Sequence, residues 1–120
     1  MKILIVDDNE SARMMIKIIL KRSGHEVIGE ASDADGAIKA FSELKPDVVL
    51  MDIIRPQRSG LEAINDILVI DPRAKIIAVT AMDQDEINIH LKKLVSAIIY
   101  KPFSFDDFER ALKKIQADHK

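Results

Sequence analysis

The sequence contains no cysteine, and only four glycines and four prolines, among its 120 residues. The absence of cysteine excludes a disulfide scaffold, a zinc site built on thiolates and a cysteine nucleophile, and it is compatible with a reducing compartment. Few glycines and prolines, combined with 48% hydrophobic and 32% charged residues, exclude a disordered segment. The composition is therefore that of a folded protein that needs neither disulfides nor a structural metal.

Neither sign of charge dominates, because 18 lysines and arginines face 20 aspartates and glutamates, for a formal net charge of -2. This balance gives no basic field that would hold nucleic acid, so direct nucleic-acid binding is not expected. The longest apolar runs have the length of a strand, and the start of the chain shows neither a signal-peptide cleavage site nor a membrane span. We therefore expect a cytoplasmic protein without membrane insertion.

The length fits one compact domain over residues 1–120. Short β-branched runs alternate with helical patterns along this length, which is typical of βαβ units and a parallel sheet. The expected strands are residues 3–6, 26–29, 48–51, 76–80 and 97–100.

Apolar residues recur at helical spacing between these strands. The five stripes are Ala12, Met15, Ile16, Ile19 and Leu20; Ala34, Ala37, Ile38, Phe41 and Leu44; Leu61, Ile64, Ile67 and Leu68; Ile87, Leu91 and Leu94; and Phe105, Phe108, Ala111, Leu112 and Ile115. Gly24 predicts the end of the first helix, residues 84–94 form the weakest pattern, and Ser104 with Asp107 predicts a capping box before the last helix. Five strands and five helices in alternation predict an α/β sandwich of three layers.

Polar residues stand where the predicted strands end. Asp7 and Asp8 follow the first strand, Asp52 the third, Thr80 closes the fourth and Lys101 follows the fifth. Because ligands of an open parallel sheet bind outside the carboxyl ends of its strands, these residues are the candidate site. Taken alone, Asp8 could equally be a helix-capping residue.

The three carboxylates together predict a cation. Two unit negative charges about 4 Å apart repel by roughly 4 kcal/mol at an effective dielectric constant near 20. An oxygen-only cluster with few protein ligands suits Mg²⁺ better than Ca²⁺, since Mg²⁺ keeps several waters and is commonly held by one or two carboxylates and a phosphate.

These motifs, with Pro56 and Gly60 after the third strand and Lys101-Pro102-Phe103 after the fifth, resemble the CheY-like receiver domain of two-component response regulators. The resemblance covers essentially the whole chain. It implies a flavodoxin-like (βα)5 three-layer sandwich whose five-stranded parallel sheet has the order 2-1-3-4-5. It also implies a cis peptide bond before Pro102.

The same resemblance implies a role for each residue of the candidate site. Asp52 resembles the phosphoacceptor, which takes a phosphoryl group from a histidine kinase or a histidine phosphotransfer protein. Asp7, Asp8, Asp52 and the backbone carbonyl of Ile54 resemble the Mg²⁺ ligands. Lys101 would neutralise a phosphoryl oxygen, and Thr80 would move toward the phosphoryl group in the active state, so that the added charge changes the affinity for a downstream protein.

The chain departs from the family pattern near its last strand. An aromatic switch residue commonly stands three positions before the lysine, where this chain has Ile98, whereas Tyr100 directly precedes Lys101. Both positions have the same strand parity, so Tyr100 could serve the same side of the sheet; the alternative is a packed aromatic at a strand end. The segment between Thr80 and Lys101 is also one residue shorter than the family pattern, which leaves the output partner open.

Two pairs of residues near Asp52 and Thr80 also differ from the family. Arg55 and Arg58 stand where methionines are common, either as solvated surface residues or as cations beside an acidic partner or the phosphoryl group. Ile54 and Met82 offer no polar group that could orient an attacking water. We therefore expect slow unaided hydrolysis of the acyl phosphate.

Several functions fit this resemblance. The chain could be a chemotaxis-type output protein, a relay intermediate, or a receiver cut from a larger regulator; a receiver-like adaptor that is not phosphorylated is a further alternative. A magnesium-dependent phosphatase is disfavoured because its Asp-x-Asp pair is absent. We expect a signalling domain rather than a turnover enzyme, catalysing only its own phosphoryl transfer and slow autodephosphorylation, as a monomer or a weak dimer.

Overall fold

The computed structural model describes residues 1–53, 58–80 and 85–118, with side chains described for most of them. Its strands are β1 (Lys2–Val6), β2 (Glu26–Ala31), β3 (Val48–Ile53), β4 (Lys75–Thr80) and β5 (Ala97–Tyr100). Its helices are α1 (Glu10–Arg22), α2 (Ala34–Leu44), α3 (Arg58–Ile70), α4 (Asp85–Leu94) and α5 (Phe105–Asp118). Strands and helices alternate as predicted.

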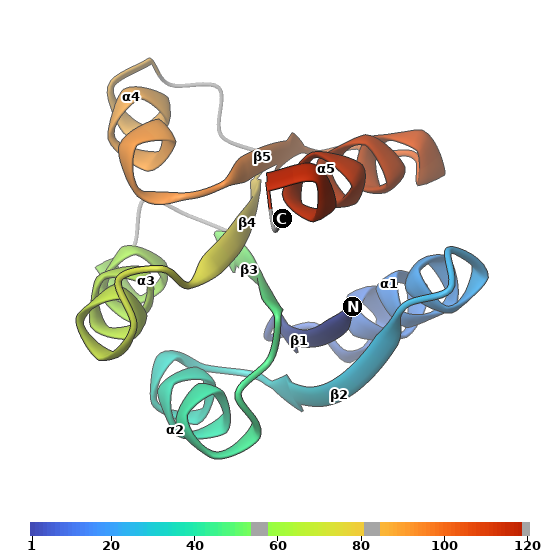
Figure 1. The fold of residues 1–120 in the computed structure, drawn as a ribbon. Coiled ribbons are helices and arrows are strands. Elements are labelled where there is room, and N and C mark those ends of the chain that lie inside the picture. Colours follow the sequence, from blue (N-terminus) through green and yellow to red (C-terminus); the bar gives the residue numbers. More distant parts are fainter. Residues whose placement is uncertain (54–57, 81–84, 119–120) are drawn as a thin grey trace.

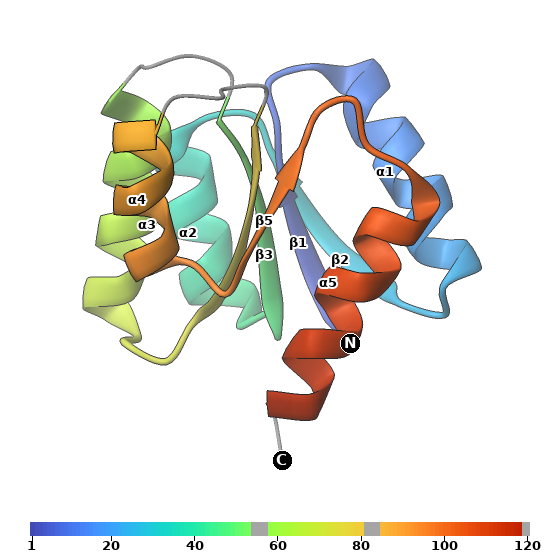
Figure 2. The same ribbon diagram turned by 90° about the horizontal axis from the view of Figure 1, so that it is seen from above.

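The five strands form one parallel sheet in the order β2-β1-β3-β4-β5, which confirms the predicted flavodoxin-like topology. Helices α1 and α5 cover one face of the sheet, and α2, α3 and α4 cover the other (Figures 1 and 2). Because all the strand pairs are parallel, the carboxyl ends of the five strands lie at the same edge of the sheet.

Each helical layer packs against its own half of the core. Under α1 and α5, buried side chains from both helices meet alternate strand residues such as Ile5, Leu50 and Val79. Under α2, α3 and α4, the neighbouring strand residues, such as Leu4, Val49 and Ala78, point the other way. This alternation follows from the two-residue period of a strand, and because both faces are covered, the strand sequences are almost continuously apolar.

Side-chain caps fix the starts of three helices. Asn9 accepts a hydrogen bond from the Ala12 N–H at 2.9 Å, and Asp33 accepts one from the Gly36 N–H at 2.7 Å. The predicted capping box before α5 is confirmed, because the Ser104 N–H donates to Asp107 at 2.8 Å and the Asp107 N–H donates back to Ser104 Oγ at 3.3 Å. Such caps satisfy backbone N–H groups that have no partner within the helix.

The prediction that Met15 belongs to the core of α1 is wrong, because this residue is 55% exposed. Successive helical residues are about 100° apart, so Met15 lies at the margin of the stripe whose centre is Ile16 and Leu20. Leu44 and Phe105 are also partly exposed, at 42% and 41%, since each stands in a terminal turn of its helix. The end of α1 is as predicted: the helix stops at Arg22, and Gly24 has the positive φ of 81° that glycine tolerates.

The predicted strand bounds were too short at four of the five strands. Strand β1 begins one residue earlier, at Lys2, and β4 one residue earlier, at Lys75; β2 continues to Ala31 and β3 to Ile53. Backbone pairing with the neighbouring strand extends each element past its apolar run. In the described part of the chain, no helix is long and apolar enough to cross a membrane.

Candidate functional site

Three carboxylates meet at the carboxyl edge of the sheet. Asp7 directly follows β1, Asp8 begins the turn into α1, and Asp52 lies in β3 opposite Val79 of β4. One oxygen from each of the three carboxylates lies within 4.8 Å of the others. The structure thus brings together the three carboxylates that the sequence predicted as metal ligands.

These carboxylates differ in their access to solvent. Asp7 is 4% exposed and the Asp52 side chain is 3% exposed, whereas Asp8 is on the surface. Two negative charges are therefore taken out of water and one faces it. Burying a carboxylate is costly unless a positive group or strong hydrogen bonds compensate it.

Lys101 supplies positive charge to Asp52. Its Nζ lies 2.7 Å from Asp52 Oδ1, and the Lys101 side chain is 31% exposed, so the ion pair reaches from the buried carboxylate to the surface. The Lys101 N–H donates to the Thr80 carbonyl at 2.9 Å, which continues the pairing of β4 with β5. The peptide bond between Lys101 and Pro102 is cis, as the sequence led us to expect.

The surroundings of Asp52 raise its pKa. The pKa of Asp52 is raised from the usual 3.8 to about 6: burial is the largest cause, the Lys101 ammonium opposes the rise, and the neighbouring Asp7 carboxylate adds to it. Burial disfavours the ionised form, and so does a like charge, whereas an opposite charge favours it. With Lys101 alone the charge of this cluster is only partly compensated.

A divalent cation fits this cluster. Both Asp52 oxygens are buried and, apart from the ion pair of Oδ1 with Lys101, neither has a hydrogen-bond partner among the residues that the structure describes. The donor set consists of carboxylate oxygens alone, which is the chemistry that Mg²⁺ prefers. Asp7, Asp8 and Asp52 could therefore hold Mg²⁺, whose charge would complete the compensation.

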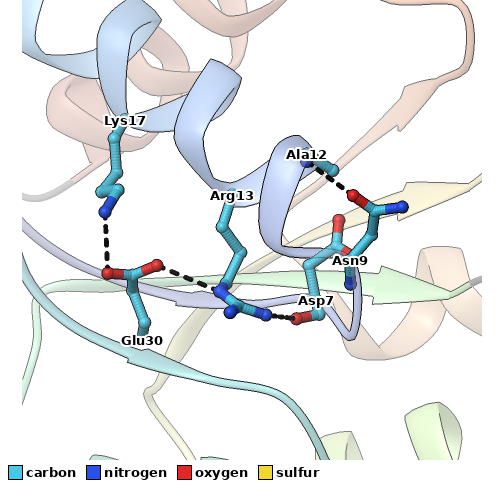
Figure 3. A network of polar contacts seen from close by, with 6 residues as sticks. All are labelled: Asp7, Asn9, Ala12, Arg13, Lys17 and Glu30. Atoms are coloured by element: carbon cyan, nitrogen blue, oxygen red, sulfur yellow. Dashed lines mark hydrogen bonds and ion pairs between the residues drawn. The ribbon is translucent and has the colours of Figure 1, made fainter.

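Asp7 is fixed on several sides. Its N–H donates to the Ala31 carbonyl at 3.0 Å, and its Oδ1 accepts the Asn9 N–H at 2.8 Å. Its carbonyl oxygen accepts a hydrogen bond from Arg13 Nη1 at 2.5 Å (Figure 3). The turn that carries the acidic pair is thus tied both to β2 and to the first turn of α1.

Sequence reasoning missed the polar residues behind this turn. Arg13 Nε donates to Glu30 Oε1 at 3.0 Å, and Lys17 Nζ donates to Glu30 Oε2 at 2.9 Å (Figure 3). The hydrogen bond from Lys17, together with the one from Arg13, lowers the pKa of Glu30. The only signal in the sequence was the spacing of Arg13 and Lys17 by four residues, which places both on one face of a helix but does not identify Glu30 as their partner.

The remaining predicted residues lie around the ends of β4 and β5. Thr80 is fully buried at the end of β4 and pairs with Ile53 on one side and Tyr100 on the other. Ile98 packs against the core under α2, α3 and α4, while Tyr100, at the end of β5, is 42% exposed. Both Ile98 and Tyr100 line a groove between β5 and α5.

Some predictions lie outside the described residues. These concern the backbone carbonyl of Ile54 as a metal ligand, the role of Arg55, and the effect of Met82 on hydrolysis. The same is true of the side chain of Arg58, although its backbone starts α3.

Comparisons with known proteins agree with this geometry. The family model described as the response regulator receiver domain matches residues 3–113. The chain is 44% identical to the chemotaxis protein CheY of Thermotoga maritima. The alignment spans 115 residues and covers 95% of this chain and 96% of that protein. It is also 44% identical to CheY of Listeria monocytogenes, over 95% of this chain and 97% of that protein. A crystal structure of a response regulator receiver domain protein from Clostridium thermocellum is similar, with a TM-score of 0.85 and 29% identity over 98% of this chain and 96% of that chain.

Proposed function

Since the chain belongs to the response regulator receiver domain family of two-component signalling, we propose that it is a phosphoacceptor switch in which Asp52 takes the phosphoryl group. One observation carries this proposal: Asp52 is a buried carboxylate with an ammonium 2.7 Å away and two further carboxylates beside it. A structural ion pair would not need the additional negative charges of Asp7 and Asp8.

The reaction is a nucleophilic transfer to the carboxylate. An Asp52 oxygen forms a bond to phosphorus, the P–N bond of a phosphohistidine on the partner breaks, and its electron pair goes to the imidazole nitrogen, which takes up a proton. The attacking group must be ionised, and with a pKa of about 6 Asp52 is mostly ionised at pH 7 to 8. Lys101 Nζ orients this carboxylate before transfer and then neutralises a phosphoryl oxygen.

Asp7, Asp8 and Asp52 would hold Mg²⁺, which when bound supplies positive charge to the phosphoryl oxygens. Three carboxylates of charge -3 then balance Lys101 and the cation at +3. Phosphorylation replaces one carboxylate by a group of charge about -2. The site then carries about one further negative charge, which additional hydrogen-bond donors would stabilise. The Thr80 hydroxyl, at the end of β4, supplies one of them, and its movement couples to Tyr100 across the β4–β5 pair.

The partners are those that this chemistry requires. A histidine kinase or a histidine phosphotransfer protein donates the phosphoryl group, and a downstream protein binds with an affinity that depends on phosphorylation. The similarity to CheY proteins favours a chemotaxis-type output; a relay intermediate is the second candidate, and the cytoplasmic location belongs to the same proposal. We propose a signalling domain over residues 1–120 that turns over no external substrate and works as a monomer or a weak dimer.

Intact-mass measurement tests this function. The native chain is incubated with a small acyl-phosphate donor, with Mg²⁺ or with a chelator, beside Asp52→Asn and the control Asp47→Asn. Asp47 precedes β3 at the opposite edge of the sheet, where it accepts a hydrogen bond from the Lys2 N–H. We expect one phosphoryl group on the native chain and on Asp47→Asn, only with Mg²⁺, and none on Asp52→Asn. No gain on the native chain would favour an adaptor that binds partners without phosphorylation.

A further inference from the structure

The guanidinium of Arg13 bridges the acidic turn and the neighbouring strand β2. One end donates to the Asp7 carbonyl at 2.5 Å and the other donates to Glu30 Oε1 at 3.0 Å. The Arg13 side chain is 17% exposed, whereas the Lys17 side chain, on the same carboxylate of Glu30, is 40% exposed. Arg13 is therefore held in a defined position, which a surface ion pair alone would not require.

This bridge acts on the backbone of a proposed metal ligand. The Asp7 carbonyl belongs to the peptide group that joins Asp7 to Asp8, so a hydrogen bond to that oxygen fixes the plane from which the Asp8 side chain departs. The Asp7 N–H is already fixed by Ala31, and its Oδ1 by the Asn9 N–H. In the part of the chain that the structure describes, the Arg13 side chain restrains the carbonyl side of this turn (Figure 3).

We propose that Arg13, anchored by Glu30, is a positioning residue that holds Asp7 and Asp8 in the geometry needed to bind Mg²⁺. This inference rests on the proposed function, because it concerns the same Mg²⁺ site. It adds Arg13 and Glu30 as residues that support the ligands of that site. Residues behind metal ligands commonly set metal affinity by fixing the orientation of the ligands. Arginine suits the role because its planar guanidinium offers donors at two ends, whereas lysine offers one compact charge.

Positioning and charge predict opposite results for the removal of Arg13. A positive charge near the site repels a cation, so if Arg13 acted only through its charge, Arg13→Gln would bind Mg²⁺ more tightly. If Arg13 positions the ligands, Arg13→Gln binds more weakly, by about tenfold. Arg13→Lys keeps the charge but cannot bridge both partners, so we expect weakened binding there too.

The experiment measures Mg²⁺ affinity by titration calorimetry on the native chain, Arg13→Gln, Arg13→Lys, Glu30→Gln and Lys17→Gln. Lys17→Gln is the matched control, since it removes a cation from the same carboxylate without touching Asp7. We expect its affinity to stay within about twofold of the native value, because it lies outside the ligand-positioning contacts. Glu30→Gln, which can still accept from Arg13, should fall between the native chain and Arg13→Gln, and it provides a second test should Arg13→Gln fold poorly.

A second measurement needs no metal. Hydrogen exchange of the Asn9 amide, which donates to Asp7, should be faster in Arg13→Gln than in the native chain and unchanged in Lys17→Gln. Equal or tighter Mg²⁺ binding by Arg13→Gln, or full affinity in Arg13→Lys, would overturn the positioning role while leaving the switch intact. A native chain that binds no Mg²⁺ and gains no phosphoryl group would instead overturn the proposed function, and with it this inference.

Discussion

The buried Asp52 carboxylate should make the metal-free protein less stable at neutral pH than its own amide variant. The Asp52 side chain is 3% exposed, and its pKa is raised from 3.8 to about 6, mainly by burial. Asp52→Asn keeps the shape of the side chain but removes the charge that burial disfavours. Lys101, at 31% exposed, remains hydrated when it loses this partner.

The sign of the effect follows from proton binding. Below pH 3.8 the carboxyl is protonated in both the folded and the unfolded chain, so its ionisation costs the fold nothing. As the pH rises toward 6 the unfolded chain ionises first, and the free energy of unfolding falls. The full loss, reached above that pH, is about 3 kcal/mol, since one pKa unit corresponds to about 1.4 kcal/mol. Between pH 4.5 and pH 7.5 the loss grows by about 2 kcal/mol.

Urea denaturation followed by circular dichroism measures this difference. The native chain and Asp52→Asn are compared at pH 4.5 and pH 7.5 with a chelator present, and the unfolding free energies are extrapolated to water. Asp8→Asn is the control, because it removes one charge from the same cluster but leaves the buried carboxylate in place. We expect the stability advantage of Asp52→Asn to widen by about 2 kcal/mol at the higher pH. An advantage that is the same at both pH values, or a native chain that is the more stable at pH 7.5, would show that the buried charge of Asp52 does not destabilise the fold.

Three further changes test the packing and the ion pair. Lys101→Met should lower the unfolding free energy at pH 7.5 by about 1–3 kcal/mol, because Asp52 loses its positive partner; an unchanged urea midpoint would contradict this. Phe108→Ala should cost about 3–5 kcal/mol in the same assay, since the ring extends from α5 into the core and is fully buried there. Gly29→Ala places a Cβ 2.5 Å from the Leu44 side chain, so it should cost about 1 kcal/mol in the native chain and less beside Leu44→Ala; equal costs in both backgrounds would show that the two side chains do not meet.

Periodicity and strand patterns in the sequence predict most of this fold. The apolar runs place all five strands because a sheet covered on both faces is apolar along its length, and no other element competes for those segments. The ends of the elements are less predictable, since backbone pairing carried β2 on to Ala31 and β3 on to Ile53. Met15 was misplaced because spacing alone does not say how wide a buried stripe is.

Some residues of the candidate site could also be predicted from the sequence, and others could not. Asp7, Asp52, Thr80 and Lys101 could be found because parallel strands end at one edge, which makes distant residues neighbours by topology. Arg13 and Glu30 could not, because their contact joins a helix to a strand 17 residues away, and no periodicity fixes such a pair. The burial difference between Asp7 and Asp8 also needed the structure, since the sequence gives two adjacent, chemically identical residues.

The most direct test of the switch locates the phosphoryl group itself. Borohydride reduces an aspartyl phosphate to homoserine, which peptide mass mapping assigns to a single position. After treatment with an acyl-phosphate donor and Mg²⁺, we expect homoserine at position 52, and none in the chelator-treated sample. Homoserine at Asp7, Asp8 or another acidic residue, or in no peptide at all, would contradict Asp52 as the phosphoacceptor.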